Sequence, residues 1–158
     1  MTQNNEQEKS VKQLRLVVHT EDYERALRFY RDVLGLEQRV AFEGEGDARV
    51  AILDAGLATL ELANPEQSRM IDGVEAEGRP SAPLRVAFEV EDSAETTEKL
   101  VDAGAELIAA PRTTPWQSVN SRIHGPAGLE VTLFQELEGV EERSERPGFV
   151  SPQIASPE

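Results

Sequence analysis

LRLVVHTEDYERAL at residues 14–27 and LRVAFEVEDSAETTEKL at residues 84–100 follow one pattern in two places. Each begins with a Leu-Arg pair in an apolar run and reaches an acidic pair seven residues later, Glu21-Asp22 or Glu91-Asp92. An Asp at this position caps the free N–H groups of a helix and its charge favours the helix N-terminus. The repeat therefore predicts a strand followed by a helix in each half of the chain.

Both expected helices, at residues 23–34 and 94–103, are followed by a glycine, Gly35 or Gly104, which suits the positive φ of a helix end. Strands are expected at residues 14–19, 38–42, 48–54 and 59–63, and again at 84–90, 106–109, 118–124 and 129–135. This order predicts an α+β protein of two βαβββ modules, with both helices on one face of the sheets. The expected organisation is a disordered tail (1–10), a first module (11–66), a polar linker (67–82), a second module (83–137) and an acidic, proline-containing tail (138–158).

Composition narrows the classes of partner. The 158 residues include 30 acidic and 16 basic side chains, a net charge of −14. Such a surface repels phosphate backbones and anionic lipid, so we expect neither a nucleic acid nor a membrane as partner. The chain has no cysteine, which excludes thiol chemistry and disulfides. Without a signal-like or membrane-spanning apolar segment, a cytoplasmic location is expected.

Three separated segments resemble the vicinal oxygen chelate superfamily, which includes glyoxalase I, extradiol dioxygenases and bleomycin resistance proteins. They are HTEDYERALRFYRDVLGL at 19–36, AFEVED at 87–92 and GPAGLEVTLF at 125–134. The resemblance implies two βαβββ modules forming a curved mixed sheet around a cup. In the enzymes of the superfamily the cup holds a divalent metal, bound by residues of the first and last strand of each module.

Carried onto this chain, the implied metal positions fall on Arg15, Glu61, Arg85 and Thr132. Only Glu61 is of the usual ligand type, because a guanidinium has no lone pair to donate and a threonine hydroxyl is a weak neutral ligand. We therefore expect no cofactor. A divalent metal remains the alternative, because a register shift of two residues would direct His19 and Glu89 into the cup beside Glu61.

Strand alternation and the loop PRTTPWQSVNSRIHG (111–125) predict which side chains line the cup. A buried arginine needs a partner, so Glu61 is expected to pair with Arg15 or Arg85, unless one of these arginines binds an anionic group of a ligand. The candidate ligand-binding residues are Arg15, His19, Glu61, Arg85, Trp116, Asn120, Arg122, Thr132 and Phe134.

The sequence leaves three functions open. The first is a small-molecule-binding protein of resistance or sequestration type with a degenerate metal site. The resemblance to bleomycin resistance proteins, which bind between two subunits, implies a homodimer, and the acidic surface would suit a cationic or amphipathic ligand. The second is a metal-dependent enzyme, either a glyoxalase-type lyase or isomerase or an extradiol-type dioxygenase. The third is a ligand-free interaction or structural subunit.

Overall fold

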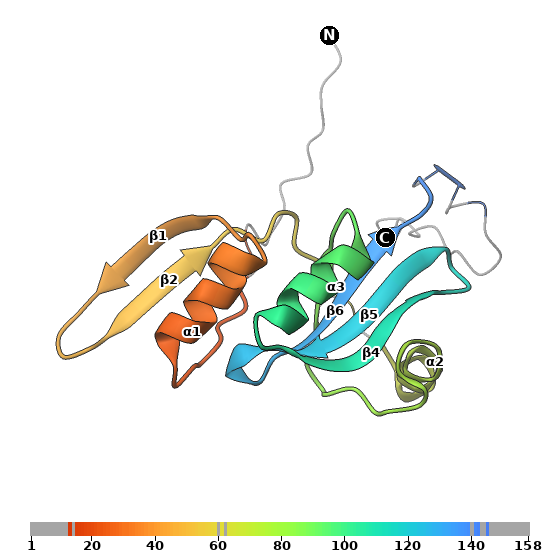
Figure 1. Cartoon of the computed structure of the whole chain (residues 1–158), viewed down its shortest axis with the longest axis horizontal. Helices are drawn as coiled ribbons and strands as arrows, with labels where there is room; N and C mark the ends of the chain where they lie inside the picture. Colours follow the sequence, from red (N-terminus) through yellow and green to blue (C-terminus); the bar gives the residue numbers. More distant parts are fainter. Residues whose placement is uncertain are drawn as a thin grey trace, which may run out of the picture.

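The computed structural model describes residues 13, 15–59, 61, 63–139, 141–142 and 145. Its strands form a two-stranded sheet and a four-stranded sheet, connected by helices (Figure 1). The elements are α1 (Tyr23–Leu27) with a π-helical continuation (Arg28–Val33), β1 (Gln38–Glu43), β2 (Arg49–Leu53), α2 (Pro65–Ala76), β3 (Val86–Glu89), α3 (Ser93–Asp102), β4 (Glu106–Thr113), β5 (Ser118–His124), a 3₁₀ turn (Pro126–Gly128) and β6 (Glu130–Glu136). In the part of the chain described, no helix combines the length and apolar character needed to cross a bilayer.

The second half of the chain forms the four-stranded sheet, in the order β3-β6-β5-β4. β3 runs parallel to β6, and the other two pairs are antiparallel. The register places Arg122 of β5 opposite Thr132 of β6, and Ile123 opposite Val131. Because successive side chains of a strand point to opposite faces, Arg122 and Thr132 lie on one face and Ile123 and Val131 on the other.

The apolar face of this sheet packs against α3 and α1. Leu100 of α3 is fully buried among Ile123, Val131 and Leu133, and the same core continues to Phe29 of the first helical segment. Tyr30 joins it and donates a hydrogen bond from Oη to the carbonyl of Pro126 at 2.9 Å. Burial of this ring raises the pKa of Tyr30. The hydrophobic contacts between the two halves of the chain are thus made on this face.

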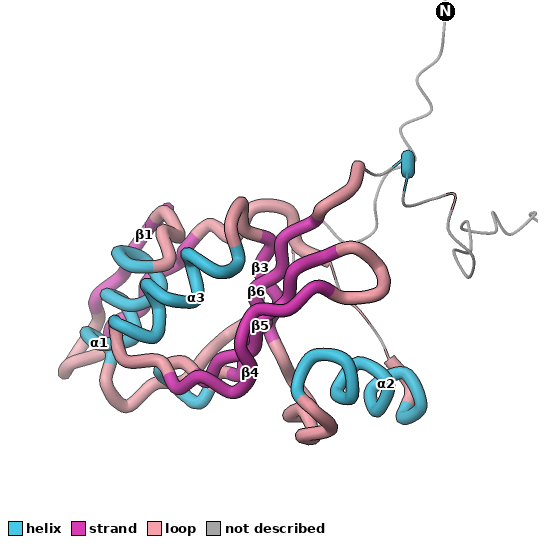
Figure 2. Tube along the Cα trace, turned by 45° about the vertical axis from the view of Figure 1, so that its right-hand side comes forward, coloured by secondary structure: helices cyan, strands magenta, loops and turns pink. Residues whose placement is uncertain are grey.

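Helix α2 lies on the other side of the four-stranded sheet, across from α3 and α1 (Figure 2). The expected connection between the modules therefore contains a third helix. The two expected helices share one face, and α2 lies on the other. The residues at the start of α2 explain why a helix forms in this connection. The side chain of Asn64 accepts a hydrogen bond from the Gln67 amide, and Pro65 takes the first helical position, where its missing N–H costs nothing.

Two expected strands are not found. Residues 15–20 form no strand, and neither do residues 58, 59, 61, 63 and 64, the described part of the second segment and its flanks. Alternation predicts an extended conformation, but a strand also needs a partner backbone, and no described strand pairs with these segments. Val17 of the first segment is 88% exposed. Six strands are thus observed among the described residues, where eight were expected.

The other expectations on local structure are confirmed within a few residues. The first helical segment runs to Val33 and α3 to Asp102, and Gly35 and Gly104 follow with φ of 94° and 106°. β4 extends to Thr113, four residues beyond the expected end. Residues 1–10 and most of 138–158, for which tails were expected, lie outside the described residues.

Candidate functional site

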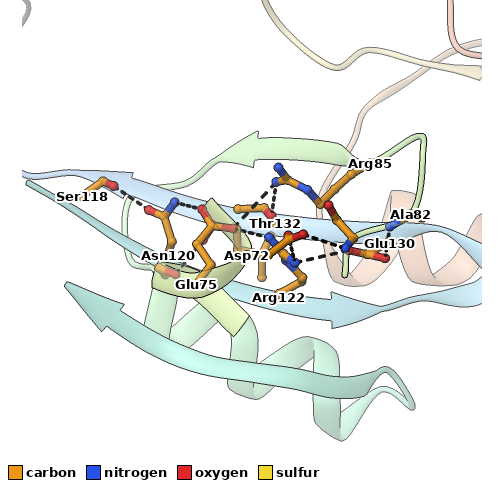
Figure 3. Close-up of polar contacts among 12 residues, drawn as sticks. Asp72, Glu75, Ala82, Arg85, Ser118, Asn120, Arg122, Glu130 and Thr132 are labelled. Carbon is orange, nitrogen blue, oxygen red and sulfur yellow. Dashed lines mark hydrogen bonds and ion pairs between the residues drawn. The ribbon is translucent and has the colours of Figure 1, made fainter. Parts of the chain in front are cut away.

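Polar side chains gather on the face of the four-stranded sheet that α2 covers. Asn120 and Arg122 come from β5, Thr132 from β6, and Arg85 from the residue before β3. All four were predicted to line the cup, and Figure 3 shows them converging beneath α2. We call this group, together with Asp72, Glu75 and Glu130, the polar cluster.

Arg122 is the centre of the polar cluster. Its side chain is 1% exposed, and its two terminal nitrogens point to different carboxylates of α2 (Figure 3). Nη1 donates to Asp72 Oδ1 and Nη2 to Glu75 Oε2, each at 2.8 Å. Glu130 Oε1 of β6 lies 3.7 Å from Nη1. A charge-assisted pair of this kind is stronger than a neutral hydrogen bond, and the fork of the guanidinium fixes its direction.

The other members of the cluster are joined through Glu75 and Thr132. Asn120 Nδ2 donates to Glu75 Oε1 at 2.5 Å, and the side-chain oxygen Oδ1 of Asn120 accepts from Ser118 Oγ at 2.6 Å. Arg85 Nη1 donates to Thr132 Oγ1 at 2.5 Å and lies 3.9 Å from Glu75 Oε2. Glu75 therefore contacts three donor side chains, two from β5 and one from the residue before β3.

Two backbone amides donate further hydrogen bonds to the acidic side chains of the cluster. Asp72 Oδ2 accepts from the amide of Ser81 at 3.1 Å, and Glu130 Oε2 accepts from the amide of Ala82 at 2.9 Å. Burial raises the pKa of Asp72, but the hydrogen bonds from Arg122 and Ser81 outweigh burial, so this pKa lies below its ordinary value. Burial also disfavours the charged form of Arg122 and so lowers its pKa. The hydrogen bonds and negative charges of Asp72 and Glu75 outweigh this effect, so the pKa of Arg122 lies above its ordinary value.

The remaining predicted residues lie apart from the polar cluster. Arg15 is exposed and donates from Nε to the side chain of Gln13 at 3.1 Å. His19 is exposed, with Nε2 3.7 Å from Glu21 Oε1, and borders a surface cavity of about 380 Å³ that shares no residue with the cluster. Glu61 is exposed as well. The expected pairing of Glu61 with an arginine is not found, because the carboxylate beside Arg85 is that of Glu75.

Trp116 and Phe134 are half-buried. Trp116 lies in the turn between β4 and β5, and Phe134 pairs with Asn120 in the ladder of β5 and β6. Neither is a member of the polar cluster.

Sequence reasoning missed the two acidic residues of α2. Asp72 and Glu75 are three residues apart, so they share a helix face with Ala76, and all three are buried. The signal was the sequence Asn64-Pro65 with Gln67 after it, which is typical of a helix start. The Gly and Pro content of the segment favoured a linker instead.

The residues present do not fit the divalent metal that the resemblance implies. Arg85 and Thr132 contact each other, whereas Arg15 and Glu61 are exposed elsewhere. The carboxylates of Asp72, Glu75 and Glu130 surround the cationic Arg122, whose charge repels a metal ion. Across residues 15–59, 63–139 and the other described positions, no three His, Cys, Asp or Glu side chains form a group able to hold one.

Replacing Arg122 with alanine should lower the free energy of unfolding by about 3–5 kcal/mol, because it leaves Asp72 and Glu75 buried without a counter-charge. Urea denaturation measures this. Arg69→Ala is the control, because Arg69 lies on α2 in an exposed pair with Glu66 and should change stability by less than about 0.5 kcal/mol. A similar small change for both variants would show that Arg122 does not hold α2 on the sheet.

The free energy of unfolding should depend on pH because the carboxyl group of Asp72 titrates differently in the folded and unfolded states. Because its folded pKa is lowered, its pairing stabilises the protein above the unfolded pKa of about 3.9 and is lost as pH falls through the folded value. Urea midpoints measured between about pH 6 and pH 3 should therefore fall less steeply for Asp72→Asn than for the wild type. Glu66→Gln makes the same charge change at an exposed site of α2 and should keep the wild-type slope. Equal slopes for Asp72→Asn and the wild type would contradict the assignment.

Comparison with known proteins gives the family. Residues 12–133 match the model of the Glyoxalase/Bleomycin resistance protein/Dioxygenase superfamily. A member of this superfamily from Sphaerobacter thermophilus is 22% identical with a TM-score of 0.50, and the match covers 76% of this chain and 92% of that chain. A hypothetical protein from S. aureus is 13% identical with a TM-score of 0.55, covering 80% and 99%.

A glyoxalase-related enzyme from Fulvimarina pelagi is 18% identical with a TM-score of 0.48, covering 80% of this chain and 89% of that chain. No curated protein matches the chain. At these identities the structures from Sphaerobacter thermophilus and S. aureus establish a shared fold and nothing about ligand or reaction. The family model spans most of the chain, so this protein belongs to the Glyoxalase/Bleomycin resistance protein/Dioxygenase superfamily, the vicinal oxygen chelate superfamily.

Proposed function

We propose that this chain binds a small molecule at the polar cluster and does so without a resident divalent metal. The observation that carries the proposal is the convergence of Arg85, Asn120, Arg122 and Thr132 on one face of the second module. A sheet face that only packed against a helix would be served by apolar side chains, as the opposite face is. Donors directed to one place are typical of a binding site.

Incomplete hydrogen bonding in the cluster supports a binding role. Among the described residues, Arg85 Nε, Arg122 Nε and Glu130 Oε1 are buried without a hydrogen-bond partner. A buried polar atom left unpaired costs on the order of 1–3 kcal/mol, more when the group is charged. Such a cost is expected where groups are arranged for a ligand and is unusual in a purely structural network.

A ligand-free subunit is the second candidate, and α2 favours it. Asp72 and Glu75 already neutralise Arg122, so the face is filled by the chain's own side chains. In that case the cluster serves only to fix α2 on the sheet. The two candidates differ in whether any compound binds at the cluster.

Ligand binding should appear as thermal stabilisation without turnover. In a fluorimetric screen of small polar molecules, a ligand at about 100 times its Kd stabilises the folded state by about 2.7 kcal/mol. The wild type and Arg69→Lys should show the same shift in Tm, because Arg69 lies outside the cluster. Arg85→Lys should lose most of it, because lysine cannot reproduce the guanidinium fork.

Metal analysis of protein purified without chelator should find far less than one divalent ion per chain. A stoichiometric ion that is lost in Glu61→Ala would instead support a metal-dependent enzyme of the superfamily. A screen in which no compound stabilises the wild type would support the ligand-free subunit.

We also propose that the chain forms a homodimer through the sheet of β1 and β2. A two-stranded sheet is marginally stable alone, and this one leaves Val40, Phe42 and Val50 37%, 58% and 48% exposed. These apolar side chains are numerous for a surface without a partner. A second copy of the chain would cover them and add strands to the outer edges of β1 and β2, which pair with no other strand among the described residues.

The dimer is tested by light scattering coupled to size exclusion. The wild type should give twice the chain mass of 17.4 kDa, and Phe42→Glu should give a monomer, because it places a charge in the proposed interface. Met70→Glu is the matched control, because Met70 is 45% exposed on α2, at the other end of the molecule (Figure 1). A monomeric wild type would overturn this interface.

A further inference from the structure

The most deeply buried contacts between α2 and the sheet are ion pairs. A helix on a sheet usually buries an apolar stripe, but the buried residues of α2 are Asp72, Glu75 and Ala76. Of its other apolar side chains, Ile71 and Val74 are half-buried and Met70 is 45% exposed. Among the large side chains of α2, those buried most deeply are therefore the two carboxylates, and both pair with Arg122.

The two carboxylates of α2 contact the sheet as a bound anion would. One lies on each terminal nitrogen of Arg122, at 2.8 Å. The carboxylate of Glu75 also accepts from Asn120 and lies within 3.9 Å of Arg85 (Figure 3). A guanidinium fork, a second arginine and an amide are the groups that proteins use to bind carboxylates.

The helix does not close tightly onto the sheet. Beside the C-terminal end of α2, a cavity of about 180 Å³ lies between Ala76 and Glu77 on one side and residues 108–110 and Arg112 of β4 on the other. The Nε atoms of Arg85 and Arg122 are not reached by the carboxylates of α2 and are buried without a partner. Both features indicate that α2 is an imperfect occupant of this face.

The net charge of the polar cluster determines which ligands this face of the four-stranded sheet can bind. With α2 in place, two guanidinium groups (Arg85 and Arg122) meet three carboxylates, so the cluster carries one net negative charge and repels an anion. Without Asp72 and Glu75, the two arginines meet Glu130 alone, and the net charge becomes positive. The face can therefore bind an anion only when α2 has moved aside.

We propose that α2 is an internal competitor for a dicarboxylate site. Asp72 and Glu75 occupy the positions of two ligand carboxylates on Arg85, Asn120 and Arg122, and a small dicarboxylate binds by displacing the helix. This inference rests on the proposed function and adds the ligand class and the conformational step. Binding is weakened by competition from α2, because the competent state is only a fraction of the population.

The test compares Asp72→Asn/Glu75→Gln with the wild type. Together the substitutions remove the two buried negative charges of α2 and keep side chains that can still hydrogen-bond to Arg122. Titration calorimetry at constant ionic strength uses malonate, succinate and glutarate as probes, with acetate for comparison. At least one dicarboxylate should bind the double variant about tenfold tighter than the wild type, because the competing carboxylates are gone. Acetate should bind both weakly.

Glu66→Gln/Glu98→Gln is the matched control, because it removes two exposed negative charges and leaves the cluster intact. It should keep the wild-type affinity. Equal gains in affinity for the two double variants would mean that net charge alone is responsible and would overturn the inference.

Hydrogen exchange on the wild-type protein tests the displacement without any variant. Saturating dicarboxylate should speed exchange of the amides of α2 (residues 65–76) and leave those of β5 protected. A ligand that binds while α2 exchange stays slow would overturn this inference and leave the proposed function standing. Failure of the proposed function is the separate result that no compound stabilises the protein at all.

Discussion

The guanidinium of Arg122 must have anionic partners, because it is 1% exposed in the middle of a sheet. Asp72 and Glu75 provide them from a helix some fifty residues away in sequence, and Glu130 provides a third from the neighbouring strand. This requirement draws the connection between the two modules back across the sheet. The contact of α2 with the sheet fulfils it, and Glu75 of the same helix also accepts from the buried Asn120.

The two halves of the described chain differ in how completely their sheets are covered. In the second module, one face of the sheet packs on Leu100 of α3 and the other lies under α2. In the first, every residue of β1 is exposed, and Val17 and Phe42 present large apolar surfaces to solvent. The four-stranded sheet thus has a packed core on one face, whereas β1 of the two-stranded sheet is exposed along its length.

Sequence alone predicted the features that depend on neighbours in the chain. Strand alternation predicts that Arg122 and Thr132 share a face of the sheet, and the register of β5 and β6 places them opposite each other. The predicted glycines at the helix ends, Gly35 and Gly104, have the positive φ expected there. Sequence alone could not predict that residues 15–20 lack a partner strand, because pairing is decided by tertiary contacts. It also could not pair Arg122 with Glu75, because the composition of residues 67–82 predicts a linker where most of α2 lies.

Buried ion pairs are a poor choice when stability is the only requirement, because apolar side chains of similar volume hold two elements together equally well or better. The α3 side of the same sheet shows that this chain can build such a contact, with Leu100 against Ile123 and Leu133. An ionic contact differs from an apolar one in that another carboxylate can replace the carboxylate of α2 on the same guanidinium. An arginine that binds a carboxylate of α2 binds a ligand's carboxylate with the same geometry, so the groups that complete the fold can also form the site.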